Sequence, residues 1–302
     1  MEDIIKQIEE KYTALGQNPE TYLKGLLHSK PLNYWDYTQV DALLNLQTPR
    51  TDFADEMIFI IYHQVTELML RLIKHEIEQV VFSDKLNTDV FVEKIERCSR
   101  YTEVLTSSFA VMSRGMNYED YNKFRLSLAP ASGFQSVQFR EIEIYTTDLI
   151  NLVRYDLKDK ATTIENSFDY LYWLDAGLDR KTGKKSLTLT QFEERYLKQL
   201  IDLANKCETI NIFQKFTAVK TTDENYKALK TALRKFDYLF NIKWPIVHLE
   251  TAESYLIEKG MKRAATGMSD WQKYLHPSYQ RRIFFPNIWS EEELKNWGNF
   301  VL

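Results

Sequence analysis

The chain has 302 residues, a formal net charge of −4 at pH 7 and a pI near 5.9, with 44% hydrophobic and 14% aromatic residues. A chain of this length and composition can bury a sizeable core. Its weak negative charge gives no field that would attract nucleic acid, and its apolar runs fall far short of the roughly 20 residues that span a bilayer. We therefore expect no nucleic-acid partner and no membrane segment. The acidic, amphipathic start MEDIIKQIEEKY does not resemble a secretory signal and favours a cytoplasmic protein.

Helical patterns dominate the chain from its first residues to about 259. Nine glycines and seven prolines are few for 302 residues, and almost no stretch alternates with the period of two that is typical of strands. We therefore predict an all-α fold without a sheet, in one domain over 1–302 with a polar helical insertion at about 155–206. The predicted helices are 2–15, 19–28, 34–46, 54–82, 88–114, 118–127, 132–154, 162–175, 190–206 and 222–259.

Start signals support three of these helices. Asn18 precedes Pro19, which is the order expected for a cap followed by proline at the first helical position. Thr51-Asp52 and Ser132 also stand where caps belong.

Two of the five histidines lie among large apolar residues. His63 occurs in FIIYHQV and His248 in WPIVHLE, whereas the other three occupy polar or helix-end positions. A histidine on an apolar helix face is more often a hydrogen-bonded core residue than a ligand, and this reading stays open for either one. His63 and His248 are the two candidates for cofactor or substrate chemistry.

The surroundings of the histidines exclude several kinds of metal site. No HExxH motif is present, no acidic residue stands three positions before a histidine, and Cys98 and Cys207 form no CxxC or CxxCH motif, which favours buried core thiols. Haem needs only one protein imidazole on its iron and an apolar slot. Two isolated histidines on long helices fit that requirement.

Pro245 bears directly on His248. It lacks the N–H that would bond to the carbonyl of Asn241, so the helix is expected to bend or break one turn before the histidine, which would tilt the imidazole away from the helix wall. Alternatively, Pro245 begins a new helix and His248 packs in its first turn. The sequence leaves both alternatives open.

A second group of candidates surrounds the turn APASG. Arg125 stands in an apolar neighbourhood, where an arginine either binds a fixed anion through its planar fork or pairs with an acidic residue of the protein. Ser132 is expected to cap the following helix and Gly133 to let a flat ligand approach closely. Tyr34 and Tyr37, in NYWDY, line a pocket or belong to the core.

Three stretches resemble the tryptophan 2,3-dioxygenases, a family of haem-dependent aromatic oxygenases. They are NYWDYTQVDALL, DEMIFIIYHQVTEL and YNKFRLSLAPASGFQSVQFR, and the resemblance is specific across about 33–145 and weaker around 236–290. It implies an all-helical haem b protein, typically a homotetramer. Its reaction would insert both atoms of O2 across the C2–C3 bond of the indole of L-tryptophan, giving N-formyl-L-kynurenine.

The resemblance also assigns roles to individual residues. His248 resembles the proximal iron ligand, and His63 the distal histidine that accepts the indole N–H. Arg125 resembles the residue that clamps the substrate carboxylate, with Tyr121 lining the same site. Phe59 resembles a wall against the indole.

Further positions follow from the same resemblance. Thr266 resembles the threonine that contacts the substrate ammonium group, and Ser132 and Gly133 would lie beside the cofactor. Tyr34 and Tyr37 match aromatic positions that reach the site from a neighbouring subunit. The N-terminal segment would then contact that neighbour in the tetramer.

The sequence departs from the family pattern in the stretch 264-AATGMSDW-271. The family's GTGGSSG loop is reduced there to Thr266-Gly267, after a longer spacing from His248, and a family tryptophan is replaced near Phe109-Ala110. Two alternatives therefore stay open. One is a haem-dependent monooxygenase or dioxygenase of a substituted indole or another aromatic amino acid, and the other is a helical binding protein without iron chemistry.

Overall fold

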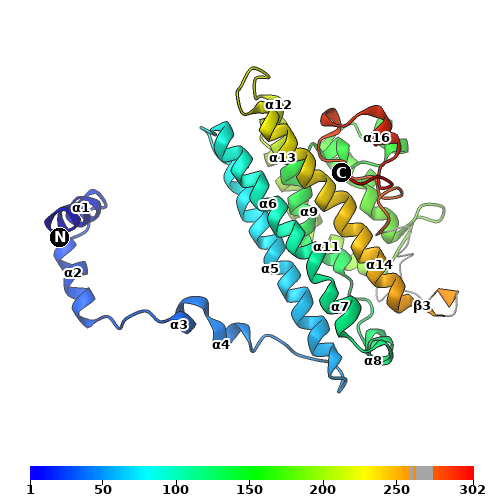
Figure 1. Cartoon of the computed structure of the whole chain (residues 1–302), viewed down its shortest axis with the longest axis horizontal. Coiled ribbons are helices and arrows are strands. Elements are labelled where there is room, and N and C mark those ends of the chain that lie inside the picture. Colours follow the sequence, from blue (N-terminus) through cyan, green and yellow to red (C-terminus); the bar gives the residue numbers. More distant parts are fainter. Residues whose placement is uncertain (259–260, 263–274) are drawn as a thin grey trace. The chain divides into compact units, whose positions relative to one another are not determined.

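The all-α prediction is confirmed by a computed structural model of the protein (Figure 1). The structure describes residues 1–258, 261–262 and 275–302. It divides into two compact units, Met1–Gln47 and Thr48–Leu302, and the predicted single domain stays a prediction. Within the described ranges, no helix is long and apolar enough to cross a membrane.

The N-terminal unit consists of four short helices. The Asn18 side chain accepts a hydrogen bond from the Glu20 N–H at 2.9 Å, which confirms the predicted cap. The predicted helix 34–46 is split at Gln39, whose φ of 53° lies in the left-handed region and ends one helix before the next begins. The helices are α1 (Glu2–Ala14), α2 (Pro19–His28), α3 (Tyr34–Thr38) and α4 (Val40–Leu43).

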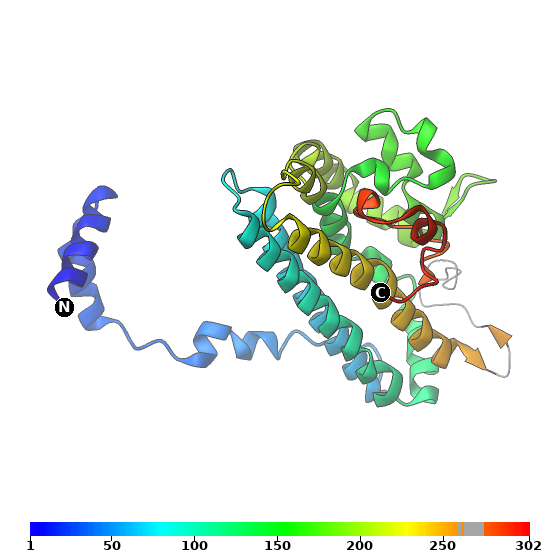
Figure 2. The same cartoon turned by 45° about the horizontal axis from the view of Figure 1, so that its top comes forward.

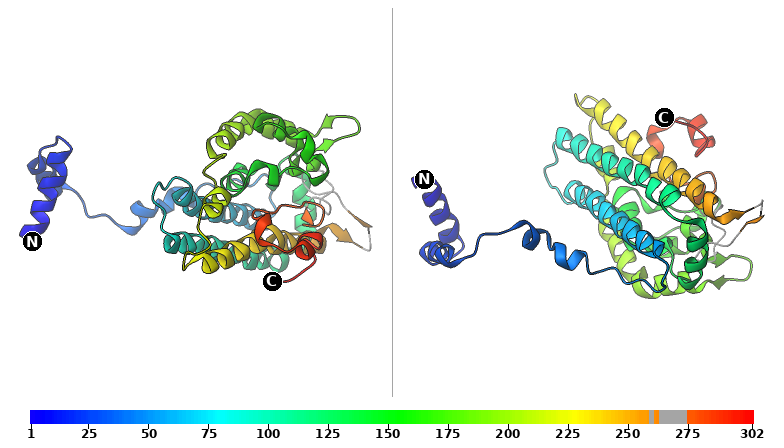
Figure 3. Two further views of the ribbon diagram at one scale, coloured as in Figure 1. Left: turned by 90° about the horizontal axis from the view of Figure 1, so that it is seen from above. Right: turned by 60° about the horizontal axis from the view of Figure 1, so that its bottom comes forward.

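Long helices form the frame of the larger unit. α13, α6, α5, α9 and α11 follow one another across it, each packed against the next, and Figures 2 and 3 show the rods side by side. Each presents an apolar stripe to its neighbours, as the 3.6-residue period predicts. Their bounds are α5 (Asp55–Val81), α6 (Thr88–Ser108), α9 (Val137–Thr146), α11 (Leu187–Cys207) and α13 (Tyr226–Tyr238).

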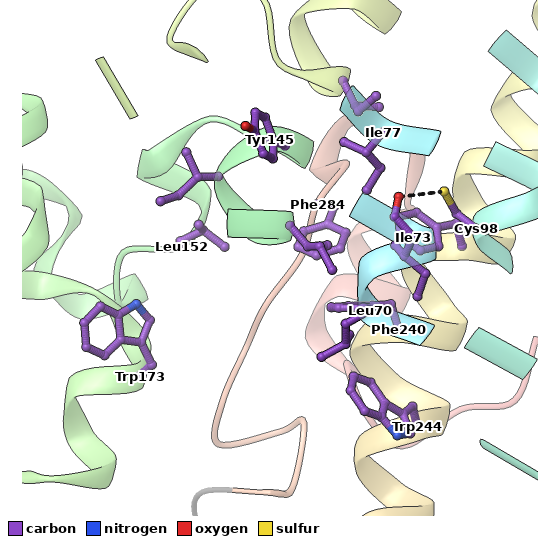
Figure 4. Packing of buried hydrophobic residues seen from close by; sticks show 14 of the residues in the cluster. Leu70, Ile73, Ile77, Cys98, Tyr145, Leu152, Trp173, Phe240, Trp244 and Phe284 are labelled. Carbon is purple, nitrogen blue, oxygen red and sulfur yellow. Dashed lines mark hydrogen bonds between the residues drawn. The ribbon is translucent and has the colours of Figure 1, made fainter. Parts of the chain in front are cut away.

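The core lies between these helices (Figure 4). Ile73 and Ile77 of α5 are fully buried against residues from several other elements, among them Phe240 and Phe284. Cys98 is buried with its thiol 3.7 Å from the Ile73 carbonyl oxygen, and both cysteines are free thiols, as predicted.

Short elements connect the long helices. Two hairpins correct the expectation that no sheet is present: β1 (Leu178–Asp179) pairs with β2 (Lys184–Lys185), and β3 (Ile257–Glu258) with β4 (Met261–Lys262), all antiparallel. Strands of two residues are too short to give a period-two pattern. The other elements are α7 (Ala110–Gly115), α8 (Tyr118–Phe124), η1 (Arg125–Ser127), η2 (Gly133–Gln135), η3 (Leu149–Asn151), η4 (Tyr155–Lys160), α10 (Ile164–Ser167), η5 (Phe168–Tyr170), η6 (Tyr172–Ala176), α12 (Ile212–Thr217), η8 (Pro286–Ile288) and α16 (Glu291–Lys295).

The two remaining cap predictions have different outcomes. Ser132 caps η2, where its hydroxyl accepts the Phe134 N–H at 3.3 Å, so this prediction is confirmed. The cap at Thr51-Asp52 is wrong, because α5 begins at Asp55 without a side-chain cap. Glu56, in the first turn of α5, instead accepts the Thr51 N–H at 2.8 Å. The carboxylate in the helix thus binds the loop before it, the reverse of the expected arrangement.

The last long helix runs without interruption past Pro245. α13 continues through a π-helical turn, η7 (Leu239–Lys243), into α14 (Trp244–Leu256), and the three form one rod in Figure 1. Pro245 cannot donate to the carbonyl one turn earlier. The wider hydrogen-bonding pattern of a π turn directly before it accommodates the missing donor. The rod therefore neither breaks nor starts anew at Pro245.

A buried carboxylate fastens the C-terminal segment to this rod. Asp237 of α13 is fully buried and accepts four hydrogen bonds: from the Asn241 amide at 2.7 Å, the Trp289 indole at 2.9 Å, and the backbone N–H groups of Phe284 at 3.1 Å and Phe285 at 3.2 Å. Burial outweighs these bonds and raises the pKa of the carboxyl to about 6.

Candidate active site

The structure brings four of the predicted residues together at one end of α5. Phe59 and His63 lie one helical turn apart with ring centroids at 4.2 Å, and Phe59 is 6.1 Å from the ring of Tyr121 on α8. Arg125, one turn after Tyr121, is 6% exposed. Burial raises the pKa of the Tyr121 hydroxyl, and the charge of Arg125 partly offsets this rise. An aromatic wall, an imidazole and a guanidinium therefore share one region.

The hydrogen bond of His63 fixes which ring nitrogen carries its proton. Nδ1 lies 2.7 Å from the carbonyl oxygen of Phe59, which can only accept, so Nδ1 donates and Nε2 keeps a lone pair. Burial lowers the pKa of the imidazole, which favours the neutral ring at pH 7. Nε2 of His63 can thus accept a hydrogen bond from an N–H group.

His248 joins the same aromatic cluster from α14. Its ring stacks on that of Phe109, with the ring centroids 5.2 Å apart. The centroids of Phe109 and Tyr62 are 5.6 Å apart, and those of Tyr62 and His63 are 5.8 Å apart. The pKa of His248 is lowered to about 4, first by burial and then by the charge of His63. The two imidazoles are therefore close enough that a charge on His63 would disfavour protonation of His248.

The surroundings of His248 fit a flat ligand. His248 is an exposed residue, yet burial lowers the pKa of its imidazole. The ring is therefore surrounded by protein atoms and still borders open space. A neutral imidazole is the form that binds a metal ion. One turn earlier, the buried Trp244 indole N–H has no acceptor among the described residues. This face of α14 therefore offers a metal ligand and an unused donor.

The turn at Ser132 and Gly133 also borders open space. A Cβ atom placed on Gly133 would meet no atom of the described residues within 4 Å, its two chain neighbours apart. Space next to the backbone is what close approach of a flat ligand requires. The Ser132 hydroxyl is engaged in capping η2.

Two hollows of about 510 and 350 Å³ lie elsewhere on this unit. The larger is lined by residues of α11 together with Gln135, and the smaller lies between the ends of α9, α10, α11 and α12. Neither is lined by Phe59, His63, Arg125 or His248. The aromatic cluster with its two imidazoles, rather than either hollow, therefore holds the side chains that could bind a metal ion or a substrate.

Comparison with known proteins shows which family the chain resembles. The family model described as tryptophan 2,3-dioxygenase matches residues 24–170. A tryptophan 2,3-dioxygenase of Ruegeria sp. (strain TM1040) is 29% identical over 284 residues, which cover 86% of this chain and 91% of that protein. One from Bacillus thuringiensis subsp. konkukian is 26% identical over 294 residues, or 91% and 98% of the two chains. Over most of its length the chain is therefore similar to tryptophan 2,3-dioxygenases.

The similarity to this family is stronger over a shorter stretch. A tryptophan 2,3-dioxygenase of Herpetosiphon aurantiacus is 42% identical over 118 residues, which cover 38% of this chain and 45% of that protein. The family model spans Phe59, His63, Tyr121 and Arg125, whereas His248 lies beyond its end. The contacts described above are what connect His248 to the other four.

Two predicted residues belong to the other unit, and a third lies outside the described residues. Tyr34 and Tyr37 lie in the N-terminal unit and are 71% and 75% exposed. Thr266 lies outside the described residues. Their roles in a tryptophan 2,3-dioxygenase site stay predictions.

Sequence reasoning missed three residues of the site. Trp244 and Asn122 stand one turn before His248 and Arg125, a spacing that could have revealed both. The sequence marks Phe109 only as the place where a family tryptophan is replaced. Its stacking on His248 joins α14 to the break between α6 and α7, which no local pattern predicts.

Proposed function

We propose that the chain is a haem b-dependent dioxygenase that inserts both atoms of O2 across the indole C2–C3 bond of L-tryptophan, giving N-formyl-L-kynurenine. The observation that carries this proposal is the arrangement of the His63 lone pair and the buried Arg125 guanidinium around the Phe59 and Tyr121 rings. An amino acid with an indole side chain offers the matching N–H, carboxylate and apolar ring. The name shared by the relatives supports the same reaction.

His248 is the residue proposed to hold the haem iron. Its neutral imidazole faces open space, Trp244 offers a donor on the same helix face, and Gly133 borders space that a porphyrin edge could occupy. When bound, the haem supplies the O2 chemistry that no side chain of the protein provides.

The other residues are proposed to bind and orient the substrate. Nε2 of His63 accepts the indole N–H, and Arg125 binds the carboxylate through its planar fork. Phe59 and Tyr121 cover the indole and keep water away from the reacting bond. Thr266 is proposed to contact the ammonium group.

One experiment tests the proposed reaction. The purified protein is reduced without oxygen, mixed with L-tryptophan and exposed to air, and the near-ultraviolet absorbance and the product mass are recorded. N-formylkynurenine with two added oxygen atoms supports the proposal. One added oxygen atom, or turnover only of another aromatic amino acid, supports the alternative oxygenase. A protein without a Soret band after growth with a haem precursor supports the binding protein.

The His63→Ala variant tests the proposed indole contact. We expect kcat/KM for L-tryptophan to fall roughly 10- to 100-fold, because the substrate N–H would lose its buried acceptor. The value for 1-methyl-L-tryptophan, which has no indole N–H, should change little. Steady-state kinetics with both substrates measure this difference. The exposed His75→Ala, on the same helix, is the matched control, and an equal loss with both substrates would contradict the assignment.

The N-terminal unit is proposed to complete the site of a neighbouring subunit in a homotetramer. None of the residues of α1 to α4 is buried within it, and Tyr34, Trp35 and Tyr37 are 71%, 56% and 75% exposed. Large aromatic side chains that remain uncovered commonly mark a surface that contacts another protein. A second copy of the chain is the partner that this proposal requires.

Subunit complementation tests this arrangement. One chain carries Tyr34→Ala and Tyr37→Ala, the other Arg125→Ala, and each alone is expected to be nearly inactive. Co-expression should restore activity, because mixed oligomers combine an intact pocket with an intact N-terminal segment from another chain. Dioxygenase activity of the purified mixed oligomers measures the effect. Activity no higher than that of the two single preparations would mean that the segment does not act between subunits.

A further inference from the structure

The guanidinium of Arg125 is held by an amide three residues earlier. Nε of Arg125 donates to Oδ1 of Asn122 at 3.1 Å, and the two side chains are 6% and 8% exposed. Both are therefore shielded from water, where a hydrogen bond to a charged group contributes more than it does at the surface.

The orientation of the Asn122 amide is itself determined. Its nitrogen donates to the carbonyl oxygen of Tyr118 at 3.0 Å and to that of Tyr255 at 3.3 Å. An amide has two N–H donors, and these two carbonyls use both. The amide cannot turn over without losing both bonds, so its oxygen is directed at Arg125.

The second carbonyl ties this arrangement to α14. Tyr255 stands two turns after His248 on the same helix, and its single hydroxyl hydrogen is shared between the carbonyl oxygens of Met112 at 2.5 Å and Met116 at 3.1 Å. Its ring also lies 4.8 Å from that of Tyr121. The last turn of α14 is thus bonded to both α7 and α8, and Asn122 connects it to the guanidinium.

We propose that Asn122 is a positioning residue for the substrate carboxylate. By engaging Nε, it sets the plane of the guanidinium so that the two terminal nitrogens, the pair that matches the two oxygens of a carboxylate, point in a fixed direction. Because its amide also spans α8 and α14, that direction is fixed relative to the helix that carries His248. This proposal rests on the proposed function, because it requires that Arg125 binds the substrate carboxylate.

Asn122→Ala in the holoenzyme is the main test variant. We expect KM for L-tryptophan to rise roughly 10-fold, with kcat within about twofold of the wild-type value. The variant would lose the fixed orientation of the Arg125 guanidinium but none of the groups that take part in the reaction. The dissociation constant of tryptamine, which lacks the carboxylate, should change by less than about twofold. Lys123→Gln is the matched control on the same short helix, since this side chain is 57% exposed.

A second background separates positioning from general loss of structure. Lysine has no Nε donor in a guanidinium plane, so Asn122→Ala should add less than about twofold to KM when it is combined with Arg125→Lys. A structural role for Asn122 would instead give the same fold increase in KM in both backgrounds, or would weaken the binding of tryptamine as much as that of L-tryptophan. Either result overturns the proposal while leaving the proposed function intact. Failure of the proposed function appears earlier, as a wild-type protein that forms no N-formylkynurenine, and the positioning role then falls with it.

Discussion

His248→Ala is expected to yield a folded protein without the Soret absorbance of bound haem and with activity reduced on the order of a thousandfold, equivalent to about 4 kcal/mol of barrier. The residues one turn away on α14 are Trp244, Pro245, Thr251 and Ala252, and none of them ligates haem iron in place of an imidazole. The absorption spectrum and the haem content per chain measure the loss.

Two controls make the result specific to His248. His75→Ala removes an exposed histidine from α5 and should retain full haem content. His248→Gly leaves space for imidazole added to the buffer, which should restore part of the Soret band. Haem content in His248→Ala equal to that of the wild type would mean that another residue binds the iron.

Asp237→Ala is expected to have the largest effect on stability, a loss of about 3 to 5 kcal/mol in the free energy of unfolding. The substitution leaves four donors without their acceptor in a fully buried place, namely the Asn241 amide, the Trp289 indole and the backbone N–H groups of Phe284 and Phe285. Urea denaturation followed by circular dichroism measures the change. A loss below about 1 kcal/mol would mean that the C-terminal segment is held mainly by its apolar contacts.

The same carboxyl predicts a pH dependence of stability. Burial raises its pKa to about 6 in the folded protein, whereas an unfolded aspartate titrates near about 3.9. Between these values the folded state binds more protons than the unfolded state, so the contribution of Asp237 to stability falls as the pH rises from about 4 to about 6. Asp237→Asn should remove this slope. Asp169→Asn, an exposed aspartate, should keep it.

The parts of the fold and site that the sequence predicts are those that depend on spacing within one helix. The period of α5 and the one-turn spacing of Phe59 and His63, and of Tyr121 and Arg125, are properties of local sequence, and the structure has them. The same holds for the caps at Asn18 and Ser132, where a side chain binds a backbone group two residues ahead.

What could not be predicted depends on contacts between distant segments or on a shifted hydrogen-bond pattern. The stacking of Phe109 on His248 and the bonds from Phe284, Phe285 and Trp289 to Asp237 join residues far apart in the chain. Periodicity also extended helices such as 132–154 beyond their actual ends, since it detects apolar faces but not the extended backbone at Ser136 and Thr147 that interrupts the helix.

The π-helical turn Leu239–Lys243 lets the two halves of one long helix turn their side chains in different directions. An α-helix advances by about 100° per residue, and a π turn accommodates about one extra residue, so every side chain after it is rotated by about that angle relative to an uninterrupted helix. α13 can therefore keep its apolar face and Asp237 against the interior while α14 aims its histidine in another direction. Deleting a single residue within this turn would leave the composition of the rod almost unchanged, yet it would swing His248 about a quarter of a revolution away from His63.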